Sequence, residues 1–199
     1  MTGEGAGDGA VRILRAEGRA AAPWSNGGGV TREIAVHPPG ADWDGFDWRV
    51  SLADVTRDGP YSPLPGVRRI LTVVDGGGLA LTVDGAPRLL PDRFRPFAFS
   101  GGAVTDCRLL DGPVVNLNVM VREGRARAVV EMVRGSRAVP PGDALVVAVE
   151  GSAQLAAPGE PGVRLARFDA AVVVAGARCE VRTAGVAAVI ALSAGGDDG

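Results

Sequence analysis

The residues with the most obvious chemical potential lie in one short segment, PWSNGGGVTREI, at residues 23–34. A phosphate-binding glycine loop requires a strand before the glycines and a helix after them, usually with Lys-Ser/Thr at the end of the glycine motif. Here the glycines lead into VTREIAV, whose β-branched residues predict a strand. We therefore interpret the segment as a tight turn before a strand. Its bare backbone would let a ligand approach beside Trp24 and Asn26.

Arginine and neutral polar side chains at strand spacing form a second group of candidates. Alternate residues of a strand share a face, so Arg49 lies with Ser51, and Glu33 lies opposite Arg32. The guanidinium fork suits a carboxylate, and neutral side chains add hydrogen bonds. An anion-reading wall of Arg32, Arg49 and Arg69 is one arrangement. The candidate ligand-binding residues are Trp24, Asn26, Arg32, Glu33, Arg49, Ser51, Ser62, Arg69 and Asn118.

Three functions compete for these residues. Binding of a small anionic metabolite by a sensor or buffer protein is favoured. The alternative is a metal-free isomerase or lyase acting on a small carboxylate, with Glu33, Asp54 or Asp58 as the base. No catalytic residue is assigned, because the chain offers no nucleophile–base pair. The third is a purely structural or protein-interaction domain.

The sequence predicts neither a metal nor another cofactor. It has a single histidine, His37, next to PPG, which predicts a surface loop. Metal sites require three or four ligands in fixed geometry, and the carboxylates are not clustered at ligand spacing. The two cysteines, Cys107 and Cys179, lack C-x-x-C spacing and are expected to be buried, reduced thiols.

Charge and hydropathy narrow the choice of partners. The formal net charge is −2, no basic run appears, and no apolar stretch is long enough to span a bilayer. We expect no nucleic-acid partner, no membrane partner and no secretory signal, and hence a cytoplasmic protein.

Short, valine-rich apolar runs separated by glycine and proline predict an all-β fold. Shifting the chain by 75 residues places LTVVDG (71–76) on VVAVEG (146–151) and FAFSGG (97–102) on VVVAGA (172–177). This self-similarity predicts two β-barrel or jelly-roll units in one chain. Residues 11–135 form the first, ligand-binding barrel and residues 136–193 a second, smaller one, with disordered tails at 1–10 and 194–199. The second unit is expected to be structural, or to offer a surface for a homodimer.

Long motifs resemble the HutD/Ves proteins: PWSNGGGVTREIAV (23–36), FDWRVSLADVTRDGPYSPLPGVRRILTVVDGGGLAL (46–81), FSGG (99–102) and LLDGPVVNLNVMVR (109–122). The resemblance implies an RmlC-like cupin fold with two barrel units. It also implies a link to bacterial histidine utilisation, through binding a pathway intermediate and tempering the pathway. This chain departs from the family pattern at three places. A lysine is usual at Ser25, an aspartate at Asn116, and an aspartate next to the glycine at the position of Gly102.

Overall fold

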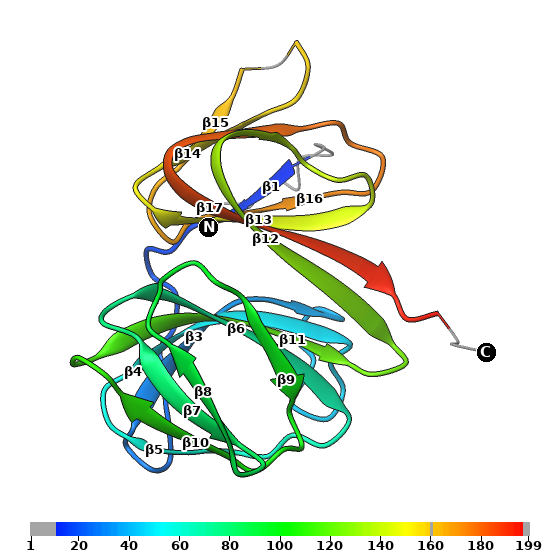
Figure 1. The fold of residues 1–199 in the computed structure, drawn as a ribbon. Helices are drawn as coiled ribbons and strands as arrows, with labels where there is room; N and C mark the ends of the chain where they lie inside the picture. Colours follow the sequence, from blue (N-terminus) through cyan, green and yellow to red (C-terminus); the bar gives the residue numbers. More distant parts are fainter. Residues whose placement is uncertain (1–10, 160, 197–199) are drawn as a thin grey trace. The chain divides into compact units, whose positions relative to one another are not determined.

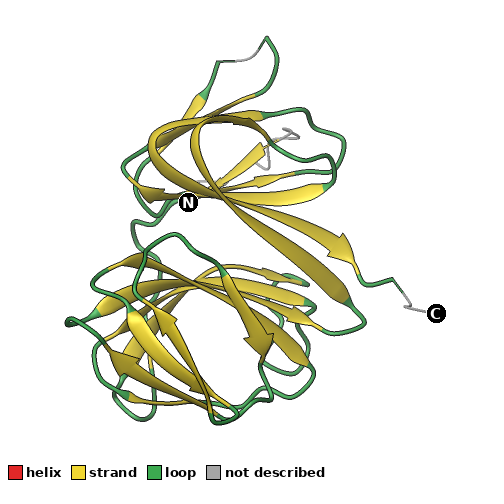
Figure 2. Cartoon of the chain, in the orientation of Figure 1, coloured by secondary structure: helices red, strands yellow, loops and turns green. Residues whose placement is uncertain are grey.

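The computed structural model describes residues 11–159 and 161–196, and this part of the chain contains strands and turns but no helix (Figure 2). The predicted all-β class is confirmed. Accordingly, no described helix is available to cross a membrane. The strands are β1 (Val11–Leu14), β2 (Ala22–Pro23), β3 (Gly29–His37), β4 (Trp48–Val55), β5 (Gly59–Tyr61), β6 (Val67–Asp75), β7 (Leu79–Val83), β8 (Ala86–Leu90), β9 (Phe97–Ser100), β10 (Thr105–Leu109), β11 (Val114–Arg122), β12 (Ala126–Ala138), β13 (Asp143–Glu150), β14 (Ala153–Ala156), β15 (Val163–Leu165), β16 (Ala170–Val173) and β17 (Glu180–Ala194).

The chain divides into two compact units, labelled by their strands in Figure 1. Of the described residues, the first unit comprises 18–130 and 193–196, and the second comprises 11–17, 131–159 and 161–192. Each unit is formed by segments that are distant in the sequence.

Two antiparallel sheets make up the first unit. One has the strand order β2-β3-β4-β11-β6-β9 and the other has the order β5-β10-β7-β8. Leu71 and Val73 from the first sheet form a single hydrophobic cluster with Leu79 and Leu81 from the second. The faces that carry these residues therefore face each other and enclose the interior of the unit. Burial of this apolar surface is the main favourable term in holding the sheets together.

The second unit has a sheet with the order β1-β16-β13-β17-β14-β15, and β12 also pairs with β17. Its core is aliphatic and includes Val146, Leu155, Leu165 and Val189. Residues 11–14 were expected in the first barrel. Instead, β1 pairs with β16 in this unit, from Val11 opposite Val173 to Leu14 opposite Ala170. The first strand of the chain thus completes a sheet otherwise made by its last third.

The two units share a set of strand pairings at the predicted offset. In the first unit β6 pairs with β9 and β11, and β7 pairs with β8 and β10. In the second unit β13 pairs with β16 and β17, and β14 pairs with β15 and β17. Gly76 and Gly151 each follow the corresponding strand, β6 or β13, and have positive φ values of 89° and 67°. That conformation favours glycine.

Two local expectations differ from the structure. His37 is the last residue of β3 rather than part of a loop, and its ring stacks on Trp48 at a centroid distance of 5.7 Å. The predicted tails lie mostly outside the described residues. Within 194–196, however, β17 continues to Ala194, and the N–H of Gly195 donates to the carbonyl of Arg125 at 2.8 Å. This backbone bond ties that part of the tail to the first unit.

Candidate functional site

The glycine segment forms a closed turn held by its own hydrogen bonds. The N–H of Trp24 donates to the carbonyl of Gly29 at 2.9 Å, and the N–H of Gly28 donates to Oδ1 of Asn26 at 2.9 Å. A Cβ on Gly29 would lie 2.4 Å from the carbonyl oxygen of Asp54, so only glycine fits there. The run leads directly into β3, as predicted, and no helix follows it. It therefore lacks the geometry of a phosphate loop.

Trp24 packs at the edge of the first unit's interior. Its Nε1–H donates to Oγ1 of Thr31 at 2.8 Å. Its ring meets Tyr61 edge-on at a centroid distance of 6.0 Å. Trp24 is thus a wall residue fixed by a hydrogen bond and an aromatic contact.

The strand register places five predicted residues on one face of the sheet, of which four are buried or partly buried and the fifth, Glu33, is exposed at its edge. Met120 of β11 lies opposite Arg49 of β4 and Arg69 of β6. Two residues earlier on β11, Asn118 lies opposite Ser51. On the opposite edge of β4 from β11, Glu33 of β3 lies opposite Ser51.

Hydrophobic clusters lie at both ends of this polar band. Val114 of β11 belongs to the cluster shared with the second sheet, and Met120 belongs to a cluster with Phe46 and Val67. Asn116 and Asn118 lie between them on the same strand. Asn118 and Tyr61 are only partly buried, so solvent reaches the band.

Arg49 is a well-anchored side chain. Its Nη1 lies 3.3 Å from Oε2 of Glu33, and its Nη2 donates to the carbonyl of Ala41 at 2.8 Å. Its Cζ lies 4.3 Å from the centroid of the Trp43 ring and 5.5 Å from that of Phe46. These contacts tie the 38–47 loop to β4. Its Nε is buried and has no hydrogen-bond partner.

Arg69 is buried with far fewer partners. The residue is 8% exposed, its Nε is buried without a hydrogen-bond partner, and no carboxylate of residues 11–159 or 161–196 forms an ion pair with it. Its Cζ lies 5.8 Å from the centroid of the Tyr61 ring. Burial lowers the pKa of the Arg69 guanidinium, because the charged form loses hydration. A buried cation without a paired anion is costly, so Arg69 is the cation that an external anion would best compensate.

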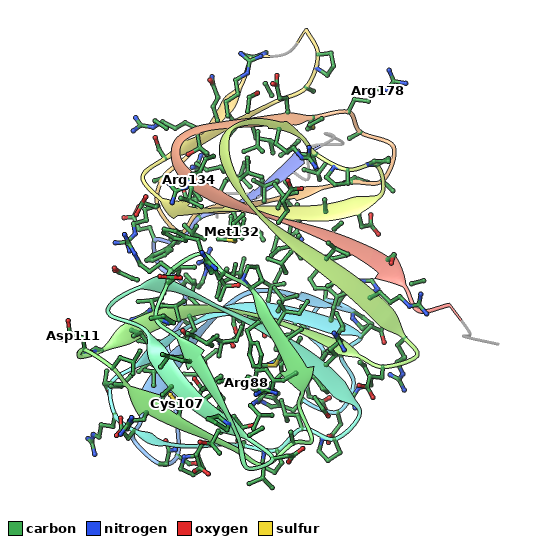
Figure 3. All side chains as sticks on the ribbon, viewed as in Figure 1. Arg88, Cys107, Asp111, Met132, Arg134 and Arg178 are labelled. Atoms are coloured by element: carbon green, nitrogen blue, oxygen red, sulfur yellow. The ribbon has the colours of Figure 1, made fainter. Side chains whose placement is uncertain are left out.

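Neutral polar groups that the candidate set did not include lie near Arg69: Tyr61 lies beside its guanidinium, and Asn116 lies beyond Tyr61. Asn116 is 0% exposed, its Nδ2 donates to the Tyr61 hydroxyl at 3.4 Å, and its Oδ1 has no partner. Cys107 of β10 (labelled in Figure 3) belongs to the hydrophobic cluster against which Tyr61 packs. Burial and then the neighbouring thiol raise the pKa of Tyr61 well above its usual value, and burial also raises the pKa of Cys107. Both groups therefore stay protonated and neutral.

Three predicted residues lie outside this interior band. Arg32 lies on the opposite face of β3, as strand alternation requires, and pairs with Asp54. The predicted wall of three arginines is therefore wrong, because one of them faces away. Asn26 is exposed and holds the glycine turn. Ser62 is exposed in the loop after β5.

Each candidate base already has a polar partner. Glu33 pairs with Arg49, and Asp54 pairs with Arg32. Asp58 accepts a hydrogen bond of 2.8 Å from the N–H of Leu109. None of the three carboxylates is buried against apolar walls. Nothing here favours the isomerase or lyase alternative.

Within the described residues, no group of three or more His, Cys, Asp or Glu side chains is placed to hold a metal ion. Cys107 and Cys179 are both buried, as expected, and neither forms a disulfide with a described cysteine.

Comparison with known proteins decides the family. The HutD family model matches residues 16–191 of the chain. The chain belongs to the HutD family. It is 43% identical over 120 residues to an uncharacterized 21.2 kDa protein in the hutC 3' region of Pseudomonas putida, covering 59% of this chain and 62% of that one. It is 39% identical over 110 residues to protein Ves of Cronobacter sakazakii, covering 55% of this chain and 59% of Ves. The chain thus spans about three fifths of the length of these two relatives.

Solved structures agree with the family and the fold. The structure of HutD from Pseudomonas fluorescens SBW25 superposes with a TM-score of 0.81 at 34% identity, covering 94% of this chain and 100% of that one. A cupin 2 conserved barrel domain protein from Leptotrichia buccalis resembles this chain in fold alone. Its TM-score is 0.56 at 13% identity, and the match covers 83% of this chain and 89% of that one. This HutD-family protein is therefore cupin-like, as the sequence motifs implied.

Proposed function

We propose that the first unit of this HutD-family protein binds a small carboxylate and acts as a sensor or buffer rather than as an enzyme. The observation that carries the proposal is Arg69, a buried guanidinium without an acidic partner among the described residues. An incoming carboxylate would supply the missing charge through a bidentate, charge-assisted contact. Asn118 and Ser51 on the same face would add neutral hydrogen bonds.

Arg49 has a supporting role in this proposal. Its cation already interacts with Glu33, the carbonyl of Ala41 and the ring of Trp43. It positions the 38–47 loop and adds positive potential to the band. A ligand can approach it only by competing with Glu33.

Three finer points belong to the same proposal. The repeated strand pairings support a bicupin architecture, with a binding first unit and a second unit filled by aliphatic side chains. The hutC-region name of the Pseudomonas putida relative supports an intermediate of histidine degradation as the ligand, and a regulatory role in that pathway. We place the protein in the cytoplasm, where such intermediates occur.

A thermal-shift screen tests the binding function directly. Sodium salts of mono- and dicarboxylic acids, from acetate to glutarate, should raise the melting temperature, because a ligand of the native state stabilises it by mass action. Sodium chloride at the same ionic strength is the control for general salt effects. If no carboxylate raises the melting temperature above this control, the proposed function is wrong.

A further inference from the structure

Among the described residues, three buried side-chain atoms of the first unit lack hydrogen-bond partners. Nε of Arg49 belongs to a guanidinium that already pairs with Glu33. The other two are Nε of Arg69, a hydrogen-bond donor, and Oδ1 of Asn116, an acceptor. Leaving a buried polar atom unpaired costs free energy, so each atom marks a position where a ligand atom would be stabilising. A ligand that pairs with both Nε of Arg69 and Oδ1 of Asn116 must carry a hydrogen-bond acceptor at one end and a hydrogen-bond donor at the other.

Tyr61 links the two positions. Its ring lies 5.8 Å from Cζ of Arg69, and its hydroxyl lies 3.4 Å from Nδ2 of Asn116. The hydrogen bond from Nδ2 to the Tyr61 hydroxyl orients the amide and leaves Oδ1 without a partner. Asn116 is therefore held in place before any ligand arrives.

The strand register sets the spacing of the two groups. Met120 lies opposite Arg69, and Asn116 is four residues from Met120 on β11. Four residues of a strand cover about 13 Å. The long side chain of Arg69 takes up part of this length. The ligand group that donates to Oδ1 of Asn116 thus lies several bonds from the ligand carboxylate that Arg69 binds.

We propose that Asn116 is a specificity-determining residue that selects carboxylates bearing an N–H or O–H donor several bonds from the carboxylate. This inference rests on the proposed carboxylate site at Arg69. A site built around a buried acceptor rejects an analogue that lacks the donor, because binding that analogue leaves the acceptor unpaired. Hydroxy acids and acylated amino acids fit this description, and plain fatty acids do not.

Matched probes isolate the donor. In each pair, a hydroxyl replaces a methyl group of similar size: 3-hydroxypropanoate with butanoate, 4-hydroxybutanoate with pentanoate, and 5-hydroxypentanoate with hexanoate. All six are carboxylates at neutral pH. Calorimetric titration of the wild-type protein should show at least one hydroxy acid binding about tenfold or more tightly than its partner, since one unmade hydrogen bond to a buried group has that effect.

Substitution shows whether Asn116 causes the preference. Asn116→Leu removes the acceptor, and the ratio of the two affinities should fall towards one. Thr72→Val is the matched control, because Thr72 is a buried polar residue on the opposite face of β6, and it should leave the ratio unchanged. If Asn116→Leu does not fold, Asn116→Ala replaces it, because it also removes the acceptor and should lower the ratio in the same way.

The outcomes separate this inference from the proposed function. If acetate binds through Arg69 but no hydroxy acid is preferred, or if the preference survives Asn116→Leu, the role of Asn116 is wrong and the carboxylate site stands. If no carboxylate binds, both proposals fail.

Discussion

Replacing Arg69 by glutamine is expected to weaken carboxylate binding about tenfold to a hundredfold, because the ligand loses charge-assisted hydrogen bonding worth roughly 1.5–3 kcal/mol. The substitution also removes a buried cation that has no acidic partner among the described residues. The ligand-free variant should therefore be at least as stable as the wild-type protein. Calorimetric titration gives the affinity, and urea unfolding gives the stability.

Arg68→Gln is the matched control for this experiment. Arg68 is the exposed neighbour of Arg69 on β6, and its loss changes the net charge of the protein by the same amount. The control should bind carboxylates like the wild-type protein. Equal weakening by both variants would point to a long-range charge effect, and an unaffected Arg69→Gln would place the ligand elsewhere.

The second large effect concerns Asp169, which ties the N-terminal strand into the second unit. Its Oδ2 accepts from Nη1 of Arg15 at 2.7 Å and from the N–H of Ala166 at 3.0 Å, and its Oδ1 accepts from the N–H of Ala16 at 2.7 Å. Asp169 is 4% exposed, so Asp169→Ala leaves the N–H groups of Ala16 and Ala166 without this acceptor and removes the charge partner of Arg15, which keeps its bond to the carbonyl of Arg164. We expect a loss of about 2–4 kcal/mol in the free energy of unfolding.

Asp143→Ala is the control within the same unit, because exposed Asp143 accepts one backbone bond of 3.2 Å, from Ala175. It should cost about 1 kcal/mol or less. Urea unfolding at pH 7 compares the variants, and hydrogen exchange should show faster exchange in β1 of Asp169→Ala. Equal costs for the two substitutions would contradict the proposed anchoring role.

The stabilising effect of Asp169 should depend on pH. Burial alone would raise the pKa of Asp169, but the bonds from Ala16, Arg15 and Ala166 outweigh burial and lower it below its usual 3.8. A carboxylate with a lowered folded-state pKa stabilises the protein above its unfolded-state pKa, and this stabilisation is lost as the pH falls through the folded-state pKa. The stability difference between wild type and Asp169→Asn should therefore be largest at neutral pH and shrink below about pH 4.

Local sequence patterns predicted the strands well, and they also predicted which side chains share a face of a strand. Alternation placed Arg49 with Ser51 and set Arg32 opposite Glu33, and the register shows both. Such predictions succeed because strand geometry alternates side chains residue by residue. The pairing of β1 with β16 joins residues about 160 positions apart, and no local pattern carries that information.

The candidate site was only partly predictable for the same reason. Tyr61 lies in a short strand within a segment rich in proline and glycine, where composition predicts a turn. Its importance comes from contacts with Asn116 and Cys107, which belong to two other strands. The pairing of Arg49 with Glu33, and the absence of such a partner for Arg69, likewise depend on the folded sheet. The sequence alone does not show which of Arg49 and Arg69 has an acidic partner.

A crystal structure of the protein with the tightest-binding carboxylate of the screen would test the central claim most directly. We predict a carboxylate oxygen within hydrogen-bond distance of the Arg69 guanidinium, inside the first unit. A carboxylate bound to Arg49 after displacing Glu33, or bound anywhere outside the first unit, would contradict the account.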